Sequence, residues 1–322
     1  MKTLLIIGGS GFFGKSILDC FHRDMLSPWS INKIKVIARN PWCLEKEIPS
    51  LINKDIELIS ADISKINYLP SADYVIHAAA SSNAQNYINS PTKERVNIIS
   101  GVSNYCKLAK IFHQNAKILY VSSGAVYGTQ PPEIENIDEN YDYNSSDILV
   151  KNKQDYTYAK RDSEKEIIQH GLSGLNVSIA RCFAFLGRWL PLDQHFAIGN
   201  FINDGLNFRP INVNAKHKVY RSYMYADDLV EWLMTIAEKS SPSCPIYNVG
   251  SDQSILIDEL AYKIGLYFGQ KISYGHYLDE FVDRYIPCTD KAKNLLQLKN
   301  RYDLDGAISK TIQLIKLQGN FV

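Results

Sequence analysis

Short apolar runs alternate with amphipathic segments from the first residues of the chain. Two longer segments, at 91–109 and about 154–170, have the spacing of helices, with Val96 and Val102 on one side of the first. Strands that alternate with helices predict an α/β fold, a Rossmann-like doubly wound parallel sheet. The apolar runs predict six buried strands, at 4–7, 34–38, 56–60, 74–78, 117–121 and 176–180.

The pattern changes at about residue 184. Prolines interrupt short segments beyond this point, a helix is predicted at 227–239, and 247–249 has the pattern of another buried strand. We therefore expect a dinucleotide-binding Rossmann domain over 1–183 and a smaller, interleaved substrate-binding region over 184–322. Elements at about 218–250 are expected to return and pack on the Rossmann domain.

The first apolar run ends in three glycines at fixed offsets, Gly8, Gly11 and Gly14, and an amphipathic stretch follows them. Gly8 suits a tight turn that a Cβ would resist. Gly11 lets backbone N–H groups approach a pyrophosphate at the positive end of a helix, and Gly14 lets that helix pack closely on the strand. A glycine-rich hairpin turn is the alternative, but the preceding strand and following helix favour a dinucleotide-binding loop.

Composition and charge exclude several classes of protein. The 322-residue chain is 45% apolar and 21% charged, with a formal net charge of +1, whereas proteins that bind nucleic acid or membrane surfaces carry a basic excess. The six cysteines are scattered without a C-x-x-C pair, so we expect no disulfides and no metal site, but reduced thiols in a cytoplasmic enzyme. The N-terminal apolar run is too short for a signal peptide or a membrane-spanning helix.

Candidate chemistry lies on the predicted helix at 154–170. Tyr156 and Lys160 are four residues apart and share one helical face. An ammonium near a phenol lowers the phenol pKa, which makes Tyr156 a candidate proton donor to a carbonyl oxygen. Alone, such a pair is more often a solvated helix face. Ser123 strengthens the hypothesis, because it follows the strand at 117–121, on the edge where doubly wound sheets bind ligands. A serine there can also simply cap a turn.

These motifs together resemble those of the extended short-chain dehydrogenases/reductases, in the NAD(P)-dependent sugar-nucleotide epimerase/dehydratase/reductase family. The resemblance covers nearly the whole chain. G-G-S-G-F-F-G at 8–14 resembles the family's glycine loop, V-S-S-G-A-V-Y-G at 121–128 resembles its S-S-x-x-V-Y-G strand end, and Y-T-Y-A-K at 156–160 matches Y-x-x-x-K. Further similar positions are Asn97 and the segments 181–187, 221–230 and 247–251.

The resemblance implies a role for each matching residue. Ser123, Tyr156 and Lys160 would form the catalytic triad, and Asp62 and Ile63 would flank adenine. The cofactor-binding residues that it implies are Gly8, Ser10, Gly11, Phe12, Phe13, Gly14, Arg39, Asp62, Ile63, Ala78, Ala79, Ala80, Asn97, Ser122, Tyr156, Lys160 and Phe183. The substrate-binding residues that it implies are Ser82, Ser123, Gly124, Ala184, His195, Asn200, Phe201, Arg221 and Arg284.

Two arginines are expected to hold a substrate diphosphate. Arg221 and Arg284 suit this role because the guanidinium fork pairs with phosphate oxygens bidentately, although either can also be an ordinary surface arginine. Ala184 stands where the family has asparagine, so His195 and Asn200 become candidates for sugar or phosphate contacts. A single loop histidine is otherwise usually structural.

The end of the second predicted strand departs from the pattern of NAD-preferring members. Those members carry an acid there, which accepts hydrogen bonds from the adenosine ribose. This chain has Ala38 and Arg39 instead, and Lys35 and Arg23 are candidates to assist. A cation in place of a carboxylate suits a 2′-phosphate. We therefore expect NADP(H), with NAD(H) as the alternative.

Two further departures restrict the reaction. Family dehydratases place Asp-Glu directly after the catalytic serine or threonine, and 3,5-epimerases place a cysteine at the second of these positions. Gly124 and Ala125 stand here, and neither can move a proton. Reactions that need only a hydride and one proton relay remain, namely reduction or epimerisation at C4.

An NADP(H) preference favours reduction, because a C4 epimerase regenerates its cofactor and typically holds NAD tightly. The segment at 185–202 also resembles enzymes of bacterial surface-polysaccharide (O-antigen) deoxysugar pathways. We therefore expect reduction of the C4 keto group of a nucleotide-activated 6-deoxyhexose of the dTDP-4-keto-6-deoxy type. The alternatives are a UDP-sugar C4 epimerase with tightly bound NAD and, from another class, a non-catalytic NADP-binding regulatory or assembly protein. The resemblance also implies a homodimer formed through the helices at 91–109 and 154–170.

Overall fold

The computed structural model describes two compact units within the chain. The described residues are 1–80, 86, 89–143, 154–192, 194 and 196–318. The first unit comprises Met1–Val126, Leu149–Cys182 and Val230–Tyr247. The second unit comprises Tyr127–Ile148, Phe183–Leu229 and Asn248–Val322.

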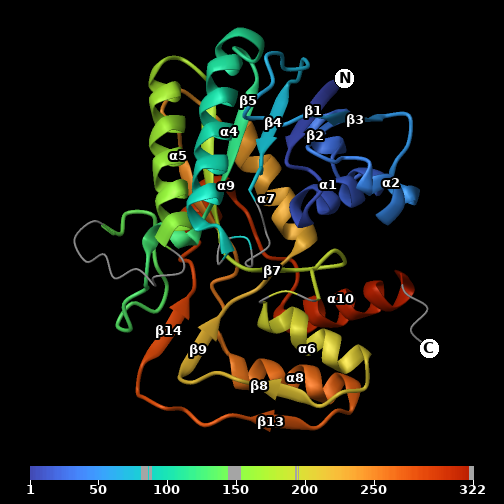
Figure 1. Cartoon of the computed structure of the whole chain (residues 1–322), viewed down its shortest axis with the longest axis vertical. Helices are drawn as coiled ribbons and strands as arrows, with labels where there is room; N and C mark the ends of the chain where they lie inside the picture. Colours follow the sequence, from blue (N-terminus) through green and yellow to red (C-terminus); the bar gives the residue numbers. More distant parts are fainter. Residues whose placement is uncertain (81–85, 87–88, 144–153, 193, 195, 319–322) are drawn as a thin grey trace. The chain divides into compact units, whose positions relative to one another are not determined.

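A seven-stranded sheet forms the centre of the first unit, in the order β11-β6-β5-β4-β1-β2-β3 (Figure 1). Neighbouring strands from β6 to β3 are parallel, which confirms the predicted Rossmann-like sheet. Each strand is short and mainly apolar because parallel strands are covered on both faces. The bounds are β1 (Lys2–Ile7), β2 (Ile31–Ala38), β3 (Ile56–Ser60), β4 (Tyr74–His77), β5 (Lys117–Ser123), β6 (Val177–Cys182) and β11 (Ile246–Val249).

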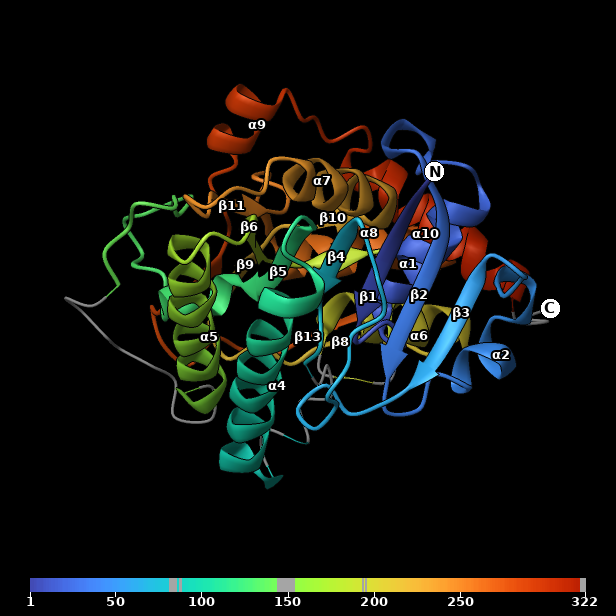
Figure 2. The ribbon, with the colours of Figure 1, turned by 90° about the horizontal axis from the view of Figure 1, so that it is seen from above.

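Helices cover both faces of this sheet. α4 (Pro91–Phe112) and α5 (Gln154–Leu172) lie side by side on one face, and α1 (Phe12–His22) lies on the other (Figures 1 and 2). The short α2 (Cys43–Glu47) follows β2, and α7 (Ala226–Glu238) contributes its later turns to this unit. The helices expected at 91–109, about 154–170 and 227–239 are therefore present.

The face that α4 buries differs from the predicted one. Val102 and Tyr105 lie in the core, but Val96 is 57% exposed. Ile98 and Cys106 are buried on the same face of the helix as Val102 and Tyr105. Glu94, in the first turn of the helix, is also buried. The prediction that Val96 faces the core is therefore wrong.

The described part of the second unit combines short strands with helices. A three-stranded sheet has the order β12 (Ile255–Leu256), β9 (Lys218–Arg221) and β14 (Val282–Tyr285). Two small pairs join β13 (Ile272–Tyr274) with β8 (Ile211–Val213), and β10 (Met224–Tyr225) with β7 (Phe185–Leu186). The helices are α6 (Ala197–Leu206), α8 (Ile257–Phe268), α9 (Asp290–Leu296) and α10 (Leu304–Gln318).

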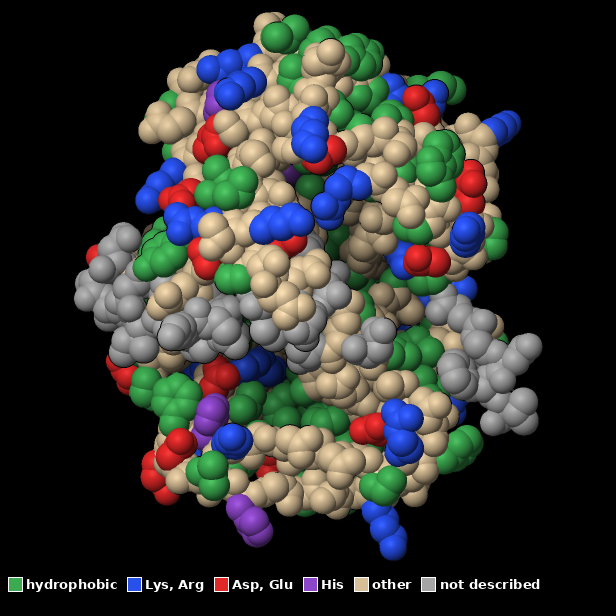
Figure 3. Space-filling view, in the orientation of Figure 1, with side chains coloured by type: hydrophobic (Ala, Val, Ile, Leu, Met, Phe, Trp, Pro, Cys, Tyr) green, Lys and Arg blue, Asp and Glu red, His purple; other side chains and the backbone are tan. Residues whose placement is uncertain are grey.

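The surface carries both signs of charge. On the face shown in Figure 3, basic and acidic side chains are interspersed rather than gathered by sign. Among the described residues, no helix has both the length and the apolar character that spanning a membrane requires. Within the same residues, no group of three or more His, Cys, Asp or Glu side chains is arranged to hold a metal ion.

Candidate active site

The glycine turn after β1 needs glycine at its first position. Gly8 has a φ of +83°, a conformation that L side chains rarely adopt. A Cβ at Gly8 would also lie 2.5 Å from the Cα atom of Ala79, just after β4. Backbone hydrogen bonds from Gly8 to Ile37 and from Ala78 to Ile7 align the ends of β1, β2 and β4. The turn is therefore held at the carboxyl edge of the sheet.

The other two glycines of the motif serve different purposes. A Cβ on Gly14 would lie 1.9 Å from the carbonyl oxygen of Gly9, so Gly14 lets α1 pack on the turn itself rather than on the strand. Gly11 is the N-cap residue of α1, and no described atom beyond its chain neighbours lies within 4 Å of the Cβ position there. The first turn of α1 contains Lys15 and no acidic residue. Exposed N–H groups at a positive helix end fit a pyrophosphate.

The end of β2 presents a cation. Arg39 is exposed, and its carbonyl oxygen accepts a hydrogen bond from the Ser60 hydroxyl at 3.1 Å. Asp62 lies beside this strand end. Burial acts to raise the pKa of Asp62, but hydrogen bonds from Ser64 and the charges of Lys65 and Arg39 outweigh it and hold the pKa below its usual range. An anionic Asp62 and a cationic Arg39 thus share this edge of the sheet.

The two cations expected to assist Arg39 are engaged elsewhere. Lys35 donates to the carbonyl oxygen of Ser71 at 3.0 Å, and Arg23 donates to Asp19 at 2.9 Å within α1. Among the described residues at the end of β2, Arg39 is therefore the cation best placed for a 2′-phosphate.

The structure brings Ser123, Tyr156 and Lys160 together. Ser123 is the last residue of β5, and its hydroxyl hydrogen-bonds the Tyr156 phenol while accepting from the N–H of Ala125 at 3.2 Å. Lys160 lies one helical turn after Tyr156, with its Nζ 5.8 Å from the centroid of the Tyr156 ring. The sheet edge and one face of α5 thus present a hydroxyl, a phenol and an ammonium to one another.

Hydrogen bonds fix α5 against the end of β5 and the 3₁₀ turn after it. Lys160 donates to the carbonyl oxygen of Val121 at 2.8 Å. Thr157 donates to Ala125 at 3.2 Å, and Arg161 donates to Val126 at 2.8 Å. These three hydrogen bonds, made within little more than one turn of α5, fix the position of that turn against the end of β5.

The expected lowering of the Tyr156 pKa is not observed. Burial raises the pKa of Tyr156 to about 12, although the hydrogen bond from Ser123 acts to lower it. Burial also lowers the pKa of Lys160 to about 8, against the opposing charges of Cys182 and Glu164. The Lys160 ammonium instead donates to the Val121 carbonyl oxygen and lies over the Tyr120 ring. Tyr156 is therefore a protonated phenol at neutral pH.

The remaining cofactor candidates of the first unit occupy varied environments. Ala78, Ala79 and Ala80 follow β4 beside the glycine turn, and the Phe12 and Phe13 rings meet edge to face at 6.0 Å. Ile63 is 9% exposed and packs against Gly101 of α4, whereas Asn97 on that helix is exposed. The Ser122 hydroxyl donates to Glu164 at 2.6 Å, so its proton is engaged within the protein.

The two diphosphate candidates of the second unit do not converge. Arg221 donates to the carboxylate of Asp283 at 2.6 Å, whereas the Arg284 guanidinium stacks on the Tyr220 ring at 4.5 Å. β9 and β14 are parallel, with Tyr220 paired to Arg284. Because successive residues of a strand point to opposite faces, Arg221 and Arg284 project from opposite faces of this small sheet. That both arginines hold one diphosphate stays a prediction, in which the two side chains would have to reach the ligand from different faces of this sheet.

Other substrate candidates are divided between core and surface. Asn200 is exposed on α6, whereas Phe201 is 4% exposed and belongs to the core of the second unit. Phe183, a candidate for cofactor binding, lies between the Tyr127 and Tyr285 rings, with centroid distances of 6.2 and 4.7 Å. Ala184 accepts a backbone hydrogen bond from Met224, and Gly124 opens the 3₁₀ turn after β5. Ser82 and His195 lie outside the described residues.

Two residues beside the candidate triad were not predicted as site residues from the sequence. Cys182 lies at the end of β6, where burial raises the pKa of its thiol while the nearby Lys160 acts to lower it. Glu164 lies one turn beyond Lys160 on α5, and its carboxylate pairs with Arg181. The signal for Glu164 was its spacing of four residues from Lys160, which places it on the same helical face.

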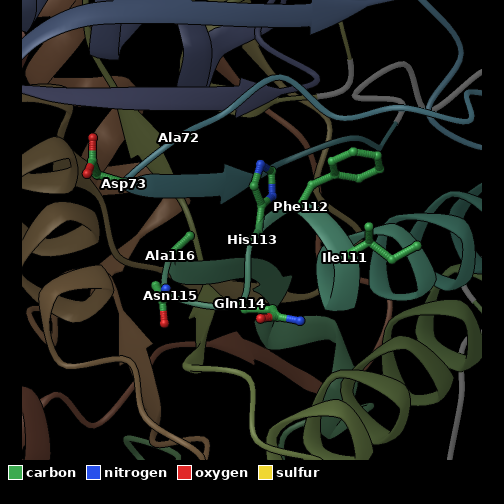
Figure 4. Close-up of a pocket in the computed structure, with 8 residues that line it drawn as sticks. All are labelled: Ala72, Asp73, Ile111, Phe112, His113, Gln114, Asn115 and Ala116. Atoms are coloured by element: carbon green, nitrogen blue, oxygen red, sulfur yellow. The ribbon is translucent and has the colours of Figure 1, made fainter.

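A separate cavity of about 220 Å³ opens at the amino ends of β4 and β5 (Figure 4). Asp73 precedes β4 and Ala116 precedes β5, whereas Ser123 ends β5 at its carboxyl end. The cavity is therefore at the other end of these strands from the triad. Its lining residues are Ala72, Asp73, Ile111, Phe112, His113, Gln114, Asn115 and Ala116.

Known proteins similar in sequence are enzymes of nucleotide-sugar metabolism. The chain is 27% identical over 317 residues to UDP-glucuronic acid decarboxylase 1 of Danio rerio, which covers 97% of this chain and 72% of that protein. It is 30% identical over 261 residues to UDP-glucuronic acid decarboxylase 3 of Arabidopsis thaliana, covering 80% of this chain and 72% of that protein.

Known structures share the fold at lower identity. The UDP-glucose 4-epimerase of Thermotoga maritima has a TM-score of 0.80 at 18% identity, covering 98% of this chain and 99% of that chain. The dTDP-glucose 4,6-dehydratase of Bacillus anthracis, in complex with NAD, has a TM-score of 0.78 at 16% identity, covering 98% and 97%. The model of the NAD dependent epimerase/dehydratase family matches residues 4–250. The chain therefore belongs to the NAD dependent epimerase/dehydratase family.

Proposed function

We propose that this protein reduces the C4 keto group of a nucleotide-activated 6-deoxyhexose, of the dTDP-4-keto-6-deoxy type, with NADPH. The observation that carries the proposal is the hydrogen-bonded pair of Ser123 and Tyr156 with the Lys160 ammonium one turn away. The nicotinamide, when bound, supplies the hydride. Family membership supports a nucleotide sugar as the substrate class.

The protein's own residues supply the proton and hold the reacting oxygen. Tyr156 is protonated at neutral pH because its pKa is raised to about 12, which suits donation to a carbonyl oxygen. The Ser123 hydroxyl can hydrogen-bond the same oxygen, since it already contacts the Tyr156 phenol. The Lys160 ammonium stabilises the phenolate left after proton transfer, because a nearby cation favours the charged form.

The two residues directly after Ser123 support reduction over elimination. Gly124 and Ala125 directly follow Ser123, and neither side chain titrates. Tyr156 is left as the one proton donor of the triad, which suffices for addition of a hydride and a proton across a carbonyl group. Elimination of water requires a further acid and base at the reacting carbons.

A cofactor preference follows from the end of β2. Arg39 is exposed there, and Lys35 and Arg23 are paired with other groups. A guanidinium binds a phosphate bidentately, so Arg39 supports NADP(H). NAD(H) is the alternative, and the dehydratase structure with similar fold was solved with NAD.

Two reactions without net consumption of cofactor compete with reduction. Known structures of similar fold include UDP-glucose 4-epimerases, and the curated relatives include UDP-glucuronic acid decarboxylases. The similarity to these two kinds of enzyme supports a second candidate function, the transient oxidation of a UDP-sugar. A non-catalytic NADP-binding protein is the alternative from another class.

One experiment separates these candidates. Purified protein is incubated with NADPH or NADH and a 4-keto-6-deoxy nucleotide sugar while the nicotinamide absorbance is followed, with Tyr156→Phe as the control. Stoichiometric loss of absorbance with a preference for NADPH is expected. No loss, with interconversion of UDP-sugars, would establish an epimerase, and conversion of UDP-glucuronic acid with release of CO₂ would establish a decarboxylase. Calorimetric cofactor binding without any turnover would favour the non-catalytic alternative.

We further propose that two copies pair through α4 and α5. Val96 and Ile111 of α4 are 57% and 68% exposed, and Leu172 at the end of α5 is 72% exposed. Apolar side chains on neighbouring helices suit burial against a second copy. Sedimentation should give a dimer for the wild type and a monomer for the double variant Val96→Glu/Ile111→Glu; an unchanged mass in that variant rejects this interface.

A further inference from the structure

A buried carboxylate joins the two elements that carry the triad, α5 and β5, to the neighbouring strand β6. Glu164 of α5 is 3% exposed and accepts a hydrogen bond from the Ser122 hydroxyl of β5 at 2.6 Å. It also accepts from Arg181 of β6, through Nε at 3.1 Å and Nη2 at 2.8 Å. Arg181 is 5% exposed. One side chain therefore ties together two strand ends and a helix in the interior of the first unit.

The spacing along α5 places this carboxylate in line with the reacting groups. Tyr156, Lys160 and Glu164 recur every four residues, so they lie on one face of the helix. On the sheet, Ser122 is paired with Arg181 in the parallel register, and Ser123 with Cys182. Glu164 thus contacts the residue pair that directly precedes Ser123 and Cys182 along the two strands.

We propose that Glu164 is a positioning residue for the Ser123, Tyr156 and Lys160 triad, with its carboxylate clamped between Ser122 and Arg181. It fixes the end of β5 against α5, and its charge supports the ammonium form of Lys160. This inference rests on the proposed function for its catalytic consequence, whereas the effect on the charge of Lys160 is independent of it.

Stability alone does not explain this arrangement. Replacing a buried ion pair by apolar residues of similar size is often neutral or stabilising, so such pairs are poor evidence of a stabilising role. The bidentate geometry and the short hydrogen bond from Ser122 instead impose one register between α5 and the strand ends. A displacement of about 1 Å at a reacting group costs about 100-fold in rate, so this register matters for catalysis.

The charge of Lys160 is set by several neighbours. Burial lowers its pKa to about 8, and Glu164 opposes that shift. The titratable or charged groups that face Lys160 or Glu164 come from four strands or loops and from α5, and they are His77, Tyr120, Tyr156, Arg181, Cys182 and Cys244. His77 stays neutral, since burial and the charge of Lys160 lower its pKa to about 4. Removing the charge of Glu164 should therefore move the Lys160 pKa downward.

Two variants separate positioning from simple support of the fold. Glu164→Gln keeps the hydrogen-bond acceptor for Ser122 but removes the charge. The double variant Glu164→Leu/Arg181→Met removes the whole pair and leaves no buried charge unpaired. Glu238→Gln is the matched control, because this carboxylate accepts from the Tyr74 hydroxyl at the amino end of β4, away from Ser123.

The experiment measures the Lys160 pKa, kcat and thermal stability of the full chain. NMR titration of protein with ¹³Cε-labelled lysine reports the pKa, with Lys160 assigned by the signal lost in Lys160→Arg. In Glu164→Gln, the Lys160 pKa should fall by about one unit and the alkaline limb of kcat should follow, while kcat at the optimum is largely kept. The double variant should fold with nearly unchanged Tm and lose about 10- to 100-fold in kcat, with little change in cofactor KM.

The outcomes that overturn the positioning role of Glu164 differ from the outcome that overturns the proposed function. Wild-type kcat in the folded double variant, or an unchanged Lys160 pKa in Glu164→Gln, overturns the positioning role. An equal pKa shift in Glu238→Gln also overturns it, because the effect is then not specific to Glu164. If the wild-type protein turns over no nucleotide sugar, the proposed function fails, and the NMR titration still decides whether Glu164 sets the charge of Lys160.

Discussion

The Lys160 ammonium donates to the Val121 carbonyl oxygen at 2.8 Å while the side chain is only 3% exposed. The residue therefore carries its charge in the interior of the first unit, one turn from Tyr156. Burial lowers its pKa to about 8, which means that the folded state disfavours the ammonium relative to the unfolded chain. A group that is costly to bury and aligned with a candidate proton donor is typical of a functional site.

Replacing Lys160 should raise stability and abolish activity. At pH 7, Lys160→Met removes a burial cost of about 3 kcal/mol but also loses a hydrogen bond worth about 1 kcal/mol, so a net gain of about 2 kcal/mol in the free energy of unfolding is expected. The gain should shrink as the pH rises through 8 toward 10.5, because the folded wild type then loses the proton while the unfolded chain keeps it. Urea unfolding at pH 7 and 9.5 measures this. A wild type more stable than the variant at pH 7 would contradict the assignment of a buried ammonium.

Tyr156→Phe should lose activity and keep the cofactor. Removal of the one phenolic proton of the triad should lower kcat by about 100-fold or more, since general acid catalysis typically contributes that much. Cofactor affinity, measured by fluorescence titration with NADPH, should change little. Tyr158→Phe is the matched control, because Tyr158 lies on the same helix but packs on Arg95 at 5.3 Å. Similar losses in both variants would show that the helix surface, rather than the Tyr156 hydroxyl, matters.

Much of the first unit could be predicted because its information is local. Apolar runs bounded by turns became β1 to β6, and the glycines, Ser123, Tyr156 and Lys160 all lie close to regular elements whose pattern is clear. The strands of the second unit were harder to predict from the sequence. β9 and β8 are three or four residues long and only partly apolar, and they become strands through pairing with β14 and β13 about sixty residues away.

The same dependence on distant parts of the chain limits how far the surroundings of the site residues can be predicted from the sequence. That Arg221 and Arg284 point to opposite faces follows from the register of β9 with β14, which no local pattern encodes. The raised pKa of Tyr156 follows from burial beneath neighbouring elements, whereas the sequence displayed only the nearby lysine. Spacing along one helix is therefore predictable, but the surroundings of the side chains are not.

Alanine at Gly11 and at Gly14 should have different effects. A methyl group at Gly11 meets no described neighbour within 4 Å, so Tm should stay near wild type while cofactor affinity falls by about 10-fold or more, because the methyl occupies the approach to the α1 N-terminus. A methyl at Gly14 overlaps the Gly9 carbonyl and should lower stability by about 1–3 kcal/mol. Thermal unfolding and NADPH titration separate the two effects. A normal cofactor affinity in Gly11→Ala would exclude this turn as the pyrophosphate site.

Arg39→Asp should reverse the cofactor preference. The exposed guanidinium is replaced by an acid that accepts hydrogen bonds from the ribose and repels a 2′-phosphate, so kcat/KM should fall about 10-fold or more with NADPH and rise with NADH. Tm should not change, because the side chain is exposed. Lys54→Asp makes the same change of charge in the exposed turn before β3 and should leave the preference unaltered. An unchanged ratio of the two kcat/KM values in Arg39→Asp would remove the argument for NADP(H).

Substitution of the two arginines of the second unit should affect substrate binding unequally. Arg221 is held by Asp283 at 2.6 Å, whereas Arg284 lies on the other face of the same sheet, against Tyr220. Because the two side chains leave opposite faces of this sheet, we expect a single arginine to dominate the binding of a diphosphate. We expect Arg221→Met to raise the nucleotide-sugar KM by about 10-fold or more, as for loss of a charge-assisted bidentate contact, and Arg284→Met to change it less than about twofold. Steady-state kinetics at saturating NADPH tests this, and equal increases in both variants would require the two side chains to reach the same ligand from opposite faces of the sheet.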